Sequence, residues 1–405
     1  MKKVLFENGI KFIYSFKDGD ISSFCAGFNA GALNEEKFKI GTAHVLEHMI
    51  SKGTKSRSEV DINSELTEIF GFENAMTNYP YTVYYGTCLC ESLRQGIELY
   101  SDILLYPSFP EKGFKEEIDI ICQELKEWKD DSAADCEAKL FANSFEKSRI
   151  SELIIGNEKS VRSITLKDVK DFYNQYYFPQ NLVISVVTSL SFEESLDIFK
   201  CYFKDFKRQT NCSLLKRQKS ILNTPGVYEA LRQDIQSSKI EYCFNCSVLT
   251  PKELYALKLF SLEFGEGSNS MLFKLLRTEN GICYDVSSSI EMGSGMMLFI
   301  IKLGAAPGNV KNVVRLITDL IVDINSDKYG LTQYNINKLA KRYKFKQALK
   351  DEKSIQMAFK MTTHELMFNE WPDNLNIPKL SENEILDVVK KVLVNPSVQI
   401  LTNVL

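Results

Sequence analysis

Histidine is scarce in this chain, which has only three histidines among 405 residues. No stretch approaches the ~20 consecutive apolar residues that a membrane-spanning helix needs. The apolar run near the N-terminus is interrupted by Glu7 and Asn8 before it reaches the length of a signal-peptide core. The net charge is only −4, and acidic and basic residues are interspersed. We therefore predict a soluble, cytoplasmic protein that binds neither nucleic acid nor a membrane.

The ten cysteines show no pattern of a metal-binding or disulfide-stabilised domain. Cys243 and Cys246 have the spacing Cys-x-x-Cys, but the surrounding residues are typical of a strand, and no second pair of Cys or His accompanies them. In a chain of this length without an export signal, we interpret the cysteines as reduced thiols that behave as small apolar side chains.

Two of the three histidines lie four residues apart in the stretch 41–54, GTAHVLEHMISKGT, where His44, Glu47 and His48 read His-x-x-Glu-His. This is the inverted form of the His-Glu-x-x-His signature of zinc proteases. On an α-helix, residues i and i+4 lie on the same face, so both imidazoles can point at one metal ion. A catalytic zinc ion needs a third protein ligand and an open fourth position. The alternative is a surface helix with two unrelated histidines.

The stretch 111–130 offers the only strong candidate for a third ligand. Its apolar residues follow the 3-4 spacing of an amphipathic helix: Phe114, Ile118, Ile121, Leu125 and Trp128. Glu117 and Glu124 are seven residues apart, so both carboxylates project from nearly the same side of this helix. Without the histidine motif, glutamates at such positions would indicate an ordinary solvated helix face.

The first half of the chain predicts a mixed α/β layout that begins with strands. Asn8-Gly9 lies between two β-rich runs and predicts a hairpin over residues 3–16. A helix is expected over 58–70, with Gly71 as its C-cap, and a strand over 81–89. Thr165 and Asp168 have the spacing of a capping box at the start of a further helix.

The second half repeats this plan loosely, which indicates an internal duplication without a second His-x-x-Glu-His. We expect strands over 239–249, 283–291 and 296–303, and helices over 251–264, 270–278, 308–325 and 331–351. Residues 207–226 lose periodicity and gain basic and turn residues. We therefore predict an N-terminal zinc-binding half over 1–210, a linker over 211–225 and a C-terminal half over 226–405. The predicted fold class is α+β, with a mainly antiparallel sheet and packed helices in each half.

The stretch GTAHVLEHMISKGT resembles the zinc-binding stretch of the pitrilysin-type (insulinase-like, M16) metallopeptidases. The resemblance is greatest to the short-chain branch that includes the mitochondrial processing peptidase β subunit and bacterial homologues. In that family the third zinc ligand is a Glu about 76 residues beyond the second His, which is Glu124 here. A supporting Glu lies seven residues before that ligand, which is Glu117 here.

Further stretches carry the same resemblance across both halves. GFENAMTNYPYTVYY, over 71–85, is similar to a family segment in which Asn-Ala-x-Thr precedes a strand, although Pro80 replaces an acid that many relatives have. The helix-Pro-x-Asn-strand segment over 165–187 also matches. In the second half, NSMLFKLLRTENGICYDVSS resembles the segment whose Arg and Tyr contact substrate, here Arg277 and Tyr284. From spacing alone, these two would indicate a solvated Arg and a packed Tyr at a helix-to-strand turn.

The resemblance implies one Zn²⁺ per chain and assigns a role to each candidate residue. The ligands are His44, His48 and Glu124; Glu47 is the general base and then the general acid; Glu117 supports a ligand; Asn74, Ala75, Arg277 and Tyr284 contact the peptide substrate. The resemblance also implies that the chain is half of a clamshell-shaped chamber. A homodimer is the simplest assembly, and a heterodimer with a homologous subunit is the alternative.

These observations predict a zinc endopeptidase that cleaves short peptides or unfolded segments in an enclosed chamber. A dedicated leader-processing or precursor-processing peptidase, working with a sister subunit, is one alternative. A non-catalytic partner subunit is another, although such subunits usually lose a zinc ligand or the general base, and this chain retains all four residues.

Overall fold

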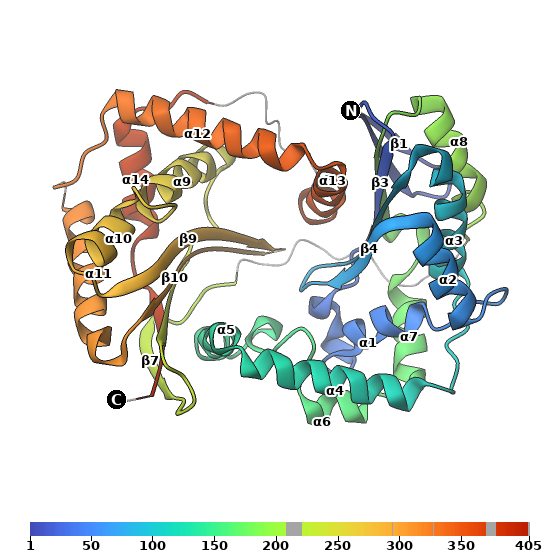
Figure 1. Ribbon diagram of the computed structural model, residues 1–405, viewed down its shortest axis with the longest axis horizontal. Helices are drawn as coiled ribbons and strands as arrows, with labels where there is room; N and C mark the ends of the chain where they lie inside the picture. The colour runs from blue at the N-terminus through green and yellow to red at the C-terminus, as the bar shows by residue number, and fades with distance from the viewer. Residues whose placement is uncertain (208–220, 294, 327, 370–377, 404–405) are drawn as a thin grey trace. The chain divides into compact units, whose positions relative to one another are not determined.

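The computed structural model describes residues 1–207, 221–293, 295–326, 328–369 and 378–403 (Figure 1). Residues 211–220 of the predicted linker therefore lie outside the described residues. Within the described ranges, none of the helices combines the length and the apolar character that crossing a membrane requires.

Two compact units make up the structure, and each is built from three chain segments. Unit 1 contains Met1–Lys126, Leu153–Arg217 and Leu349–Pro372, and unit 2 contains Glu127–Glu152, Gln218–Ala348 and Asp373–Leu405. Each predicted half of the sequence thus contributes one segment to the unit that is formed mainly by the other half. The predicted ends of the two sequence halves, at residues 210 and 226, remain a prediction.

Unit 1 contains a six-stranded sheet in the order β1-β2-β6-β3-β5-β4, so that β4 lies at one edge. Its strands are β1 (Lys2–Leu5), β2 (Lys11–Phe16), β3 (Ile21–Phe28), β4 (Phe70–Thr77), β5 (Thr82–Leu89) and β6 (Leu182–Thr188). All neighbouring strands are antiparallel except β2 and β6. The β1–β2 pair is the hairpin predicted from Asn8-Gly9.

Helices cover both faces of this sheet, so the inner strands β2, β6, β3 and β5 are largely buried on both sides, whereas the edge strands β1 and β4 are mostly exposed. The larger core lies between the sheet and α1 (Thr42–Ile50), α3 (Leu93–Leu105), α7 (Leu166–Tyr176) and α8 (Phe192–Phe203). Along β3, Phe24, Ala26 and Phe28 point into that core, whereas Cys25 belongs to a smaller core on the opposite face. There α13 (Ser354–Phe368) packs against β3 and β6 (Figure 1).

The first half contains four further helices: α2 (Glu59–Ile69), α4 (Phe114–Asp130), α5 (Ser132–Ser144) and α6 (Glu158–Ser163). Of these, α5 belongs to unit 2. The capping box predicted at the start of α7 is present, because the Thr165 side chain accepts from the Asp168 N–H and the Asp168 carboxylate accepts from the Thr165 N–H.

Unit 2 contains a five-stranded sheet in the order β7-β11-β8-β10-β9. The strands are β7 (Gly226–Leu231), β8 (Ser238–Asn245), β9 (Cys283–Gly293), β10 (Met296–Ala305) and β11 (Ser397–Thr402). Only β7 and β11 are parallel, as only β2 and β6 are in unit 1. The order β2-β6-β3-β5-β4 thus recurs as β7-β11-β8-β10-β9. This repetition confirms the predicted α+β fold of two homologous halves.

The helices of unit 2 are arranged in the same way around their sheet. Its second-half helices are α9 (Pro251–Phe264), α10 (Met271–Phe273), α11 (Val310–Asn325), α12 (Gln333–Asp351, whose last residues belong to unit 1) and α14 (Glu382–Val392). The main core joins the sheet to α9, α11 and α14. The opposite face packs against α5, which the first half supplies, just as the second half supplies α13 to unit 1.

The prediction that Gly71 caps the helix over 58–70 is wrong. The helix α2 ends at Ile69, and Phe70 already begins β4. The pairing of β4 with β5 shifts between Phe70 and Phe72, so Gly71 is the extra residue of a bulge. Burial of the Phe70 ring against Phe24 decides this local structure. Sequence periodicity misses β4 because most of its side chains are exposed.

Three carboxylates surround one lysine between α5 and the sheet of unit 2. Glu241 on β8 is only 3% exposed, and its Oε2 has no hydrogen-bond partner among the described residues. Lys302, its register partner on β10, contacts Glu137 of α5 at 3.0 Å and Glu291 of β9 at 3.6 Å. Burial raises the pKa of Glu241 to about 8; Lys302 opposes this rise, and Glu137 and Glu291 add to it. The buried carboxyl is therefore protonated at neutral pH.

We expect Glu241→Gln to stabilise the protein in a pH-dependent way. A carboxyl whose pKa rises on folding from an ordinary 4.5 to about 8 takes up a proton on folding. The stability that this proton contributes is fully present below pH 4.5 and is lost as the pH rises toward about 8. Gln keeps the shape without the charge, so its melting temperature should exceed that of the wild type at about pH 8 and match it at about pH 5. Thermal unfolding at both pH values tests this, and an equal loss of stability at both would contradict it.

Candidate metal centre

The helix α1 carries three polar residues on a framework of buried apolar ones. Ala43, Val45, Leu46, Met49 and Ile50 are buried in the core of unit 1. His44, Glu47 and His48 lie on the remaining side of the helix and are half-buried.

The N-terminus of α1 is held by a buried carboxylate and a glycine. Glu35 is 3% exposed and accepts hydrogen bonds from the backbone N–H of Gly41, at 3.1 Å, and of Ala43, at 2.8 Å. A carboxylate is favourable there because the first N–H groups of a helix lack partners within the helix. Gly41 has φ +97°, and a Cβ on it would lie 2.6 Å from the Ile155 carbonyl oxygen. Both contacts fix where α1 begins, and the sequence analysis did not identify Glu35.

The two histidines of α1 meet Glu124 of α4. Their ring centroids are 4.6 Å apart. Nε2 of His44 lies 3.8 Å from Glu124 Oε1, and Nε2 of His48 lies 3.7 Å from Glu124 Oε2. One ligand atom from each residue lies within 4.8 Å of the other two, and no other such group of His, Cys, Asp or Glu occurs in the described ranges. The Glu124 side chain is 42% exposed, so solvent can reach this side of the cluster.

The electrostatics of the histidines favour metal ligation. Burial, with the neighbouring charge of His48, lowers the pKa of His44 to about 3, so His44 is a neutral imidazole. Burial would also lower the pKa of His48, but the carboxylates of Glu117, Glu47 and Glu124 raise it overall. A cation shared by these side chains would replace the proton that His48 would otherwise bind.

A second carboxylate orients His48. Glu117 is buried, and its Oε1 lies 2.8 Å from Nδ1 of His48. Its other oxygen lies 2.5 Å from Nζ of Lys52, which also contacts Glu59 at 2.8 Å. Burial would raise the pKa of Glu117, but the contacts with His48 and Lys52 lower it overall. An ionised Glu117 accepts a hydrogen bond from the Nδ1–H of His48 and leaves Nε2 free for a metal. The role of Lys52 could not be predicted from the sequence, because a lysine just beyond a helix usually indicates a solvated position.

Glu47 lies beside the triad and is held by β4. Its Oε2 accepts a hydrogen bond from the Thr77 hydroxyl at 2.5 Å. Burial raises the pKa of Glu47, and the Thr77 hydrogen bond and the charge of His48 oppose the rise. Asn74 and Ala75 lie in β4 itself, paired with Tyr85 and Tyr84 of β5, and not on a segment that precedes the strand. Since β4 is the edge strand and packs against α1, its free edge lies near the histidine helix.

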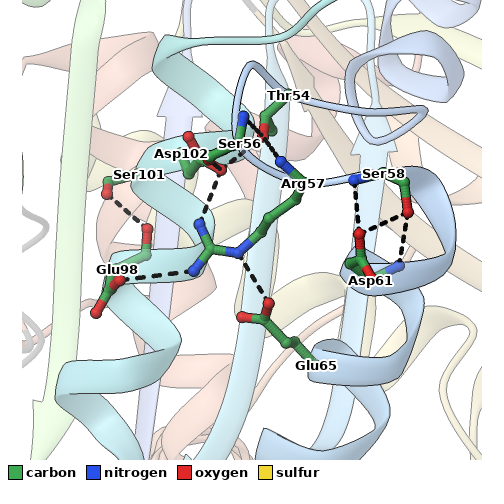
Figure 2. Close-up of polar contacts among 9 residues, drawn as sticks. All are labelled: Thr54, Ser56, Arg57, Ser58, Asp61, Glu65, Glu98, Ser101 and Asp102. Carbon is green, nitrogen blue, oxygen red and sulfur yellow. Dashed lines mark hydrogen bonds and ion pairs between the residues drawn. The ribbon is translucent and has the colours of Figure 1, made fainter.

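An arginine network holds the segment that joins α1 to α2 (Figure 2). The guanidinium of Arg57 contacts Glu65 of α2 at 2.9 Å and Asp102 of α3 at 2.9 Å. The hydroxyls of Thr54 and Ser56 donate to the same Asp102 oxygen, as Figure 2 shows. Burial would raise the pKa of Asp102, but these three donors lower it overall. The sequence analysis did not identify this network, which ties the end of the histidine helix to two others.

Arg277 and Tyr284 lie together in unit 2. The Arg277 guanidinium donates to the Tyr284 carbonyl oxygen at 3.1 Å, and its carbon lies 4.9 Å from the ring centroids of both Phe273 and Tyr284. Tyr284 is 79% exposed, so the alternative of a packed tyrosine is wrong. His44, His48 and Glu124 belong to unit 1.

The fold and the site define an α+β protein with a candidate His-His-Glu metal centre. Residues 14–158 match the sequence model described as insulinase (peptidase family M16), and residues 163–343 match the one described as the peptidase M16 inactive domain. The chain belongs to the M16 peptidase family.

Individual relatives agree with this assignment. An uncharacterized zinc protease of Rickettsia bellii is 27% identical over 262 residues, which cover 64% of this chain and 62% of that protein. The β subunit of the human mitochondrial-processing peptidase is 29% identical over 201 residues, or 49% of this chain and 41% of that subunit. The matched regions thus span less than two thirds of these relatives.

Solved structures show the same fold over the full chain. The crystal structure of a protease from Helicobacter pylori has a TM-score of 0.90 at 19% identity and covers 99% of both chains. A peptidase M16 inactive domain from Pseudomonas fluorescens has a TM-score of 0.83 at 14% identity and covers 100% of this chain and 98% of the other. Such low identity supports a common fold and not a common activity.

Proposed function

We propose that this chain is a zinc-dependent endopeptidase that cleaves short peptides or unfolded segments. The observation that carries this proposal is the convergence of His44, His48 and Glu124 within 4.8 Å, with Glu47 beside them. Relatives named as zinc proteases support the choice of metal and reaction.

The donor set fits one zinc ion per chain. Two imidazoles and one carboxylate are the ligands of a common class of catalytic zinc site with an open fourth position. His44 is neutral, and Glu117 holds His48 in the tautomer that presents Nε2. When bound, zinc would supply a Lewis acid that lowers the pKa of a water molecule and polarises a carbonyl group.

Glu47 is the proton carrier in this proposal. Burial raises its pKa toward the working pH, which suits a group that must first accept and then return a proton. It accepts the proton of the attacking water and donates it to the leaving amine. Glu117 and Lys52 contribute by fixing the orientation of His48.

The free edge of β4 is the proposed binding site for the peptide backbone. An edge strand presents unpaired N–H and C=O groups, with which an extended peptide can form a further strand. Asn74 and Ala75 lie in this strand next to the histidine helix. We also assign substrate contacts to Arg277 and Tyr284. The Tyr284 ring is exposed, and the Arg277 guanidinium packs against it.

The assembly belongs to the proposal as well. A homodimer would supply both the metal centre and the Arg277–Tyr284 pair twice, and it would enclose a chamber between the chains. The human β subunit among the relatives favours a second candidate, a processing peptidase that works in a heterodimer with a homologous subunit. A non-catalytic partner subunit is the third.

Metal removal and peptide cleavage test these candidates together. We expect about one zinc ion per chain, loss of cleavage of a fluorogenic peptide mixture after chelation, and recovery on adding zinc. Cleavage of a single precursor, with most of the mixture intact, would indicate a dedicated processing enzyme. Retained zinc without turnover of any peptide, alone or with a homologous subunit, would contradict the endopeptidase and favour the partner role.

A further inference from the structure

Thr77 contacts the Glu47 carboxylate through its hydroxyl, which donates a hydrogen bond, and through its backbone. It is the last residue of β4 and is 8% exposed. Its hydroxyl donates to Glu47 Oε2 at 2.5 Å and lies 3.2 Å from the hydroxyl of Thr82 on β5. Thr82 in turn donates to the carbonyl oxygen of Ala30 at 3.0 Å and is fully buried. The buried hydroxyls of Thr77 and Thr82 therefore lie next to each other, and that of Thr77 contacts the proposed general base.

Backbone hydrogen bonds from other segments fix the backbone around Thr77. The turn after β4 is closed by a hydrogen bond from Asn78 N to Tyr81 O at 2.7 Å. Ala32 N donates to Asn78 O at 3.0 Å and Leu33 N to Tyr79 O at 2.8 Å, so a second segment clamps the same turn. A Cβ on Gly31 would lie 2.2 Å from the Asn78 carbonyl oxygen, so only glycine permits this close approach.

Glu47 needs such an external support. Its side chain is half-buried, and a glutamate has three rotatable bonds that α1 alone does not restrain. A displacement of about 1 Å at a reacting group can lower a rate by ~10²-fold. Thr77 lies on a strand whose position is fixed by β5 and by the turn contacts. Its hydroxyl can therefore hold the Glu47 carboxylate in one place.

We propose that Thr77 is a positioning residue, whose hydroxyl holds the Glu47 carboxylate beside His48 and Glu124. The strand that receives the peptide would thereby also orient the general base. This inference rests on the proposed peptidase function and adds a residue to it. In this role Thr77 acts through Glu47 and is not itself a catalytic residue.

Two substitutions separate the hydroxyl from the shape of the side chain. Thr77→Val removes the hydroxyl and keeps the volume, whereas Thr77→Ser keeps the hydroxyl. We expect Thr77→Val to lower kcat by about 10- to 100-fold, with KM and zinc content unchanged, and Thr77→Ser to retain most of the activity. Thr67→Val, at an exposed threonine of α2, is the matched control. A wild-type kcat in Thr77→Val, or an equal loss in Thr77→Ser, would overturn the proposal.

A second measurement is independent of peptidase activity. Melting temperatures of the metal-free wild type, Thr77→Val, Glu47→Ala and the double variant form a double-mutant cycle. We expect Thr77→Val to lower the melting temperature less in the Glu47→Ala background than alone. Additive effects would overturn the positioning role. If the zinc-loaded wild type cleaves no peptide, alone or with a homologous subunit, the proposed function fails, but this cycle still decides whether Thr77 supports Glu47.

Discussion

The Glu47→Gln variant should keep its zinc and lose peptide cleavage by about 10²–10⁴-fold, which is the usual contribution of a general acid–base group. Glu47 is not part of the His-His-Glu cluster, so its replacement removes no ligand atom. Gln has nearly the same shape and can still accept the Thr77 hydrogen bond, but it cannot take up a proton near neutral pH. The measurement is zinc content and cleavage of a fluorogenic peptide mixture on both proteins in parallel.

The outcomes of this comparison separate the roles assigned to Glu47. Zinc in both proteins with activity only in the wild type would support the peptidase mechanism. Normal cleavage by Glu47→Gln would show that another group carries the proton. Loss of zinc from the variant would instead indicate that Glu47 belongs to the metal site.

Replacing residues of α4 should lower zinc affinity in a graded way. Glu124→Ala removes one of three ligands, so we expect a loss beyond the ~10–100-fold that removal of a supporting group typically causes. Glu117→Gln removes only the charge that holds His48 and Lys52, so its effect should fall within about 10–100-fold. Competition with a chelator of known affinity measures both.

Glu116→Ala is the matched control, because Glu116 is an exposed glutamate on the same helix. It should bind zinc as the wild type does. Equal zinc affinities of Glu124→Ala and the wild type would contradict the ligand assignment. A larger loss of zinc affinity in Glu117→Gln than in Glu124→Ala would indicate that Glu117 is the ligand and Glu124 the supporting group.

The candidate metal centre shows how much local sequence patterns can predict. The i, i+4 spacing of His44 and His48 predicts a shared face, because helix geometry depends only on neighbouring residues. The heptad spacing of Glu117 and Glu124 was likewise visible, and the structure brings both to the histidines. The spacing did not indicate which of the two glutamates lies near Nε2 of the histidines. That assignment came from the family resemblance.

Other parts of the site left no readable pattern. Thr77 reaches Glu47, and Lys52 reaches Glu117, through contacts between residues 30 and 65 positions apart. Thr77 lies in β4, whose exposed residues give no hydrophobic alternation. Glu35 is buried and caps the first turn of α1, although it lies among charged residues in the sequence.

The sequence by itself determined many of the helices and strands, the capping box at Thr165 and the shared face of His44 and His48, because each depends on side chains a few positions apart. It did not predict α13, α14 or β11 near the C-terminus. Only the tertiary structure decided that α5 and α13 pack on the sheet formed mainly by the other half, that Phe70 begins a strand, and that Thr77 and Lys52 contact Glu47 and Glu117. These features depend on burial and pairing between distant segments, where packing outweighs local preference.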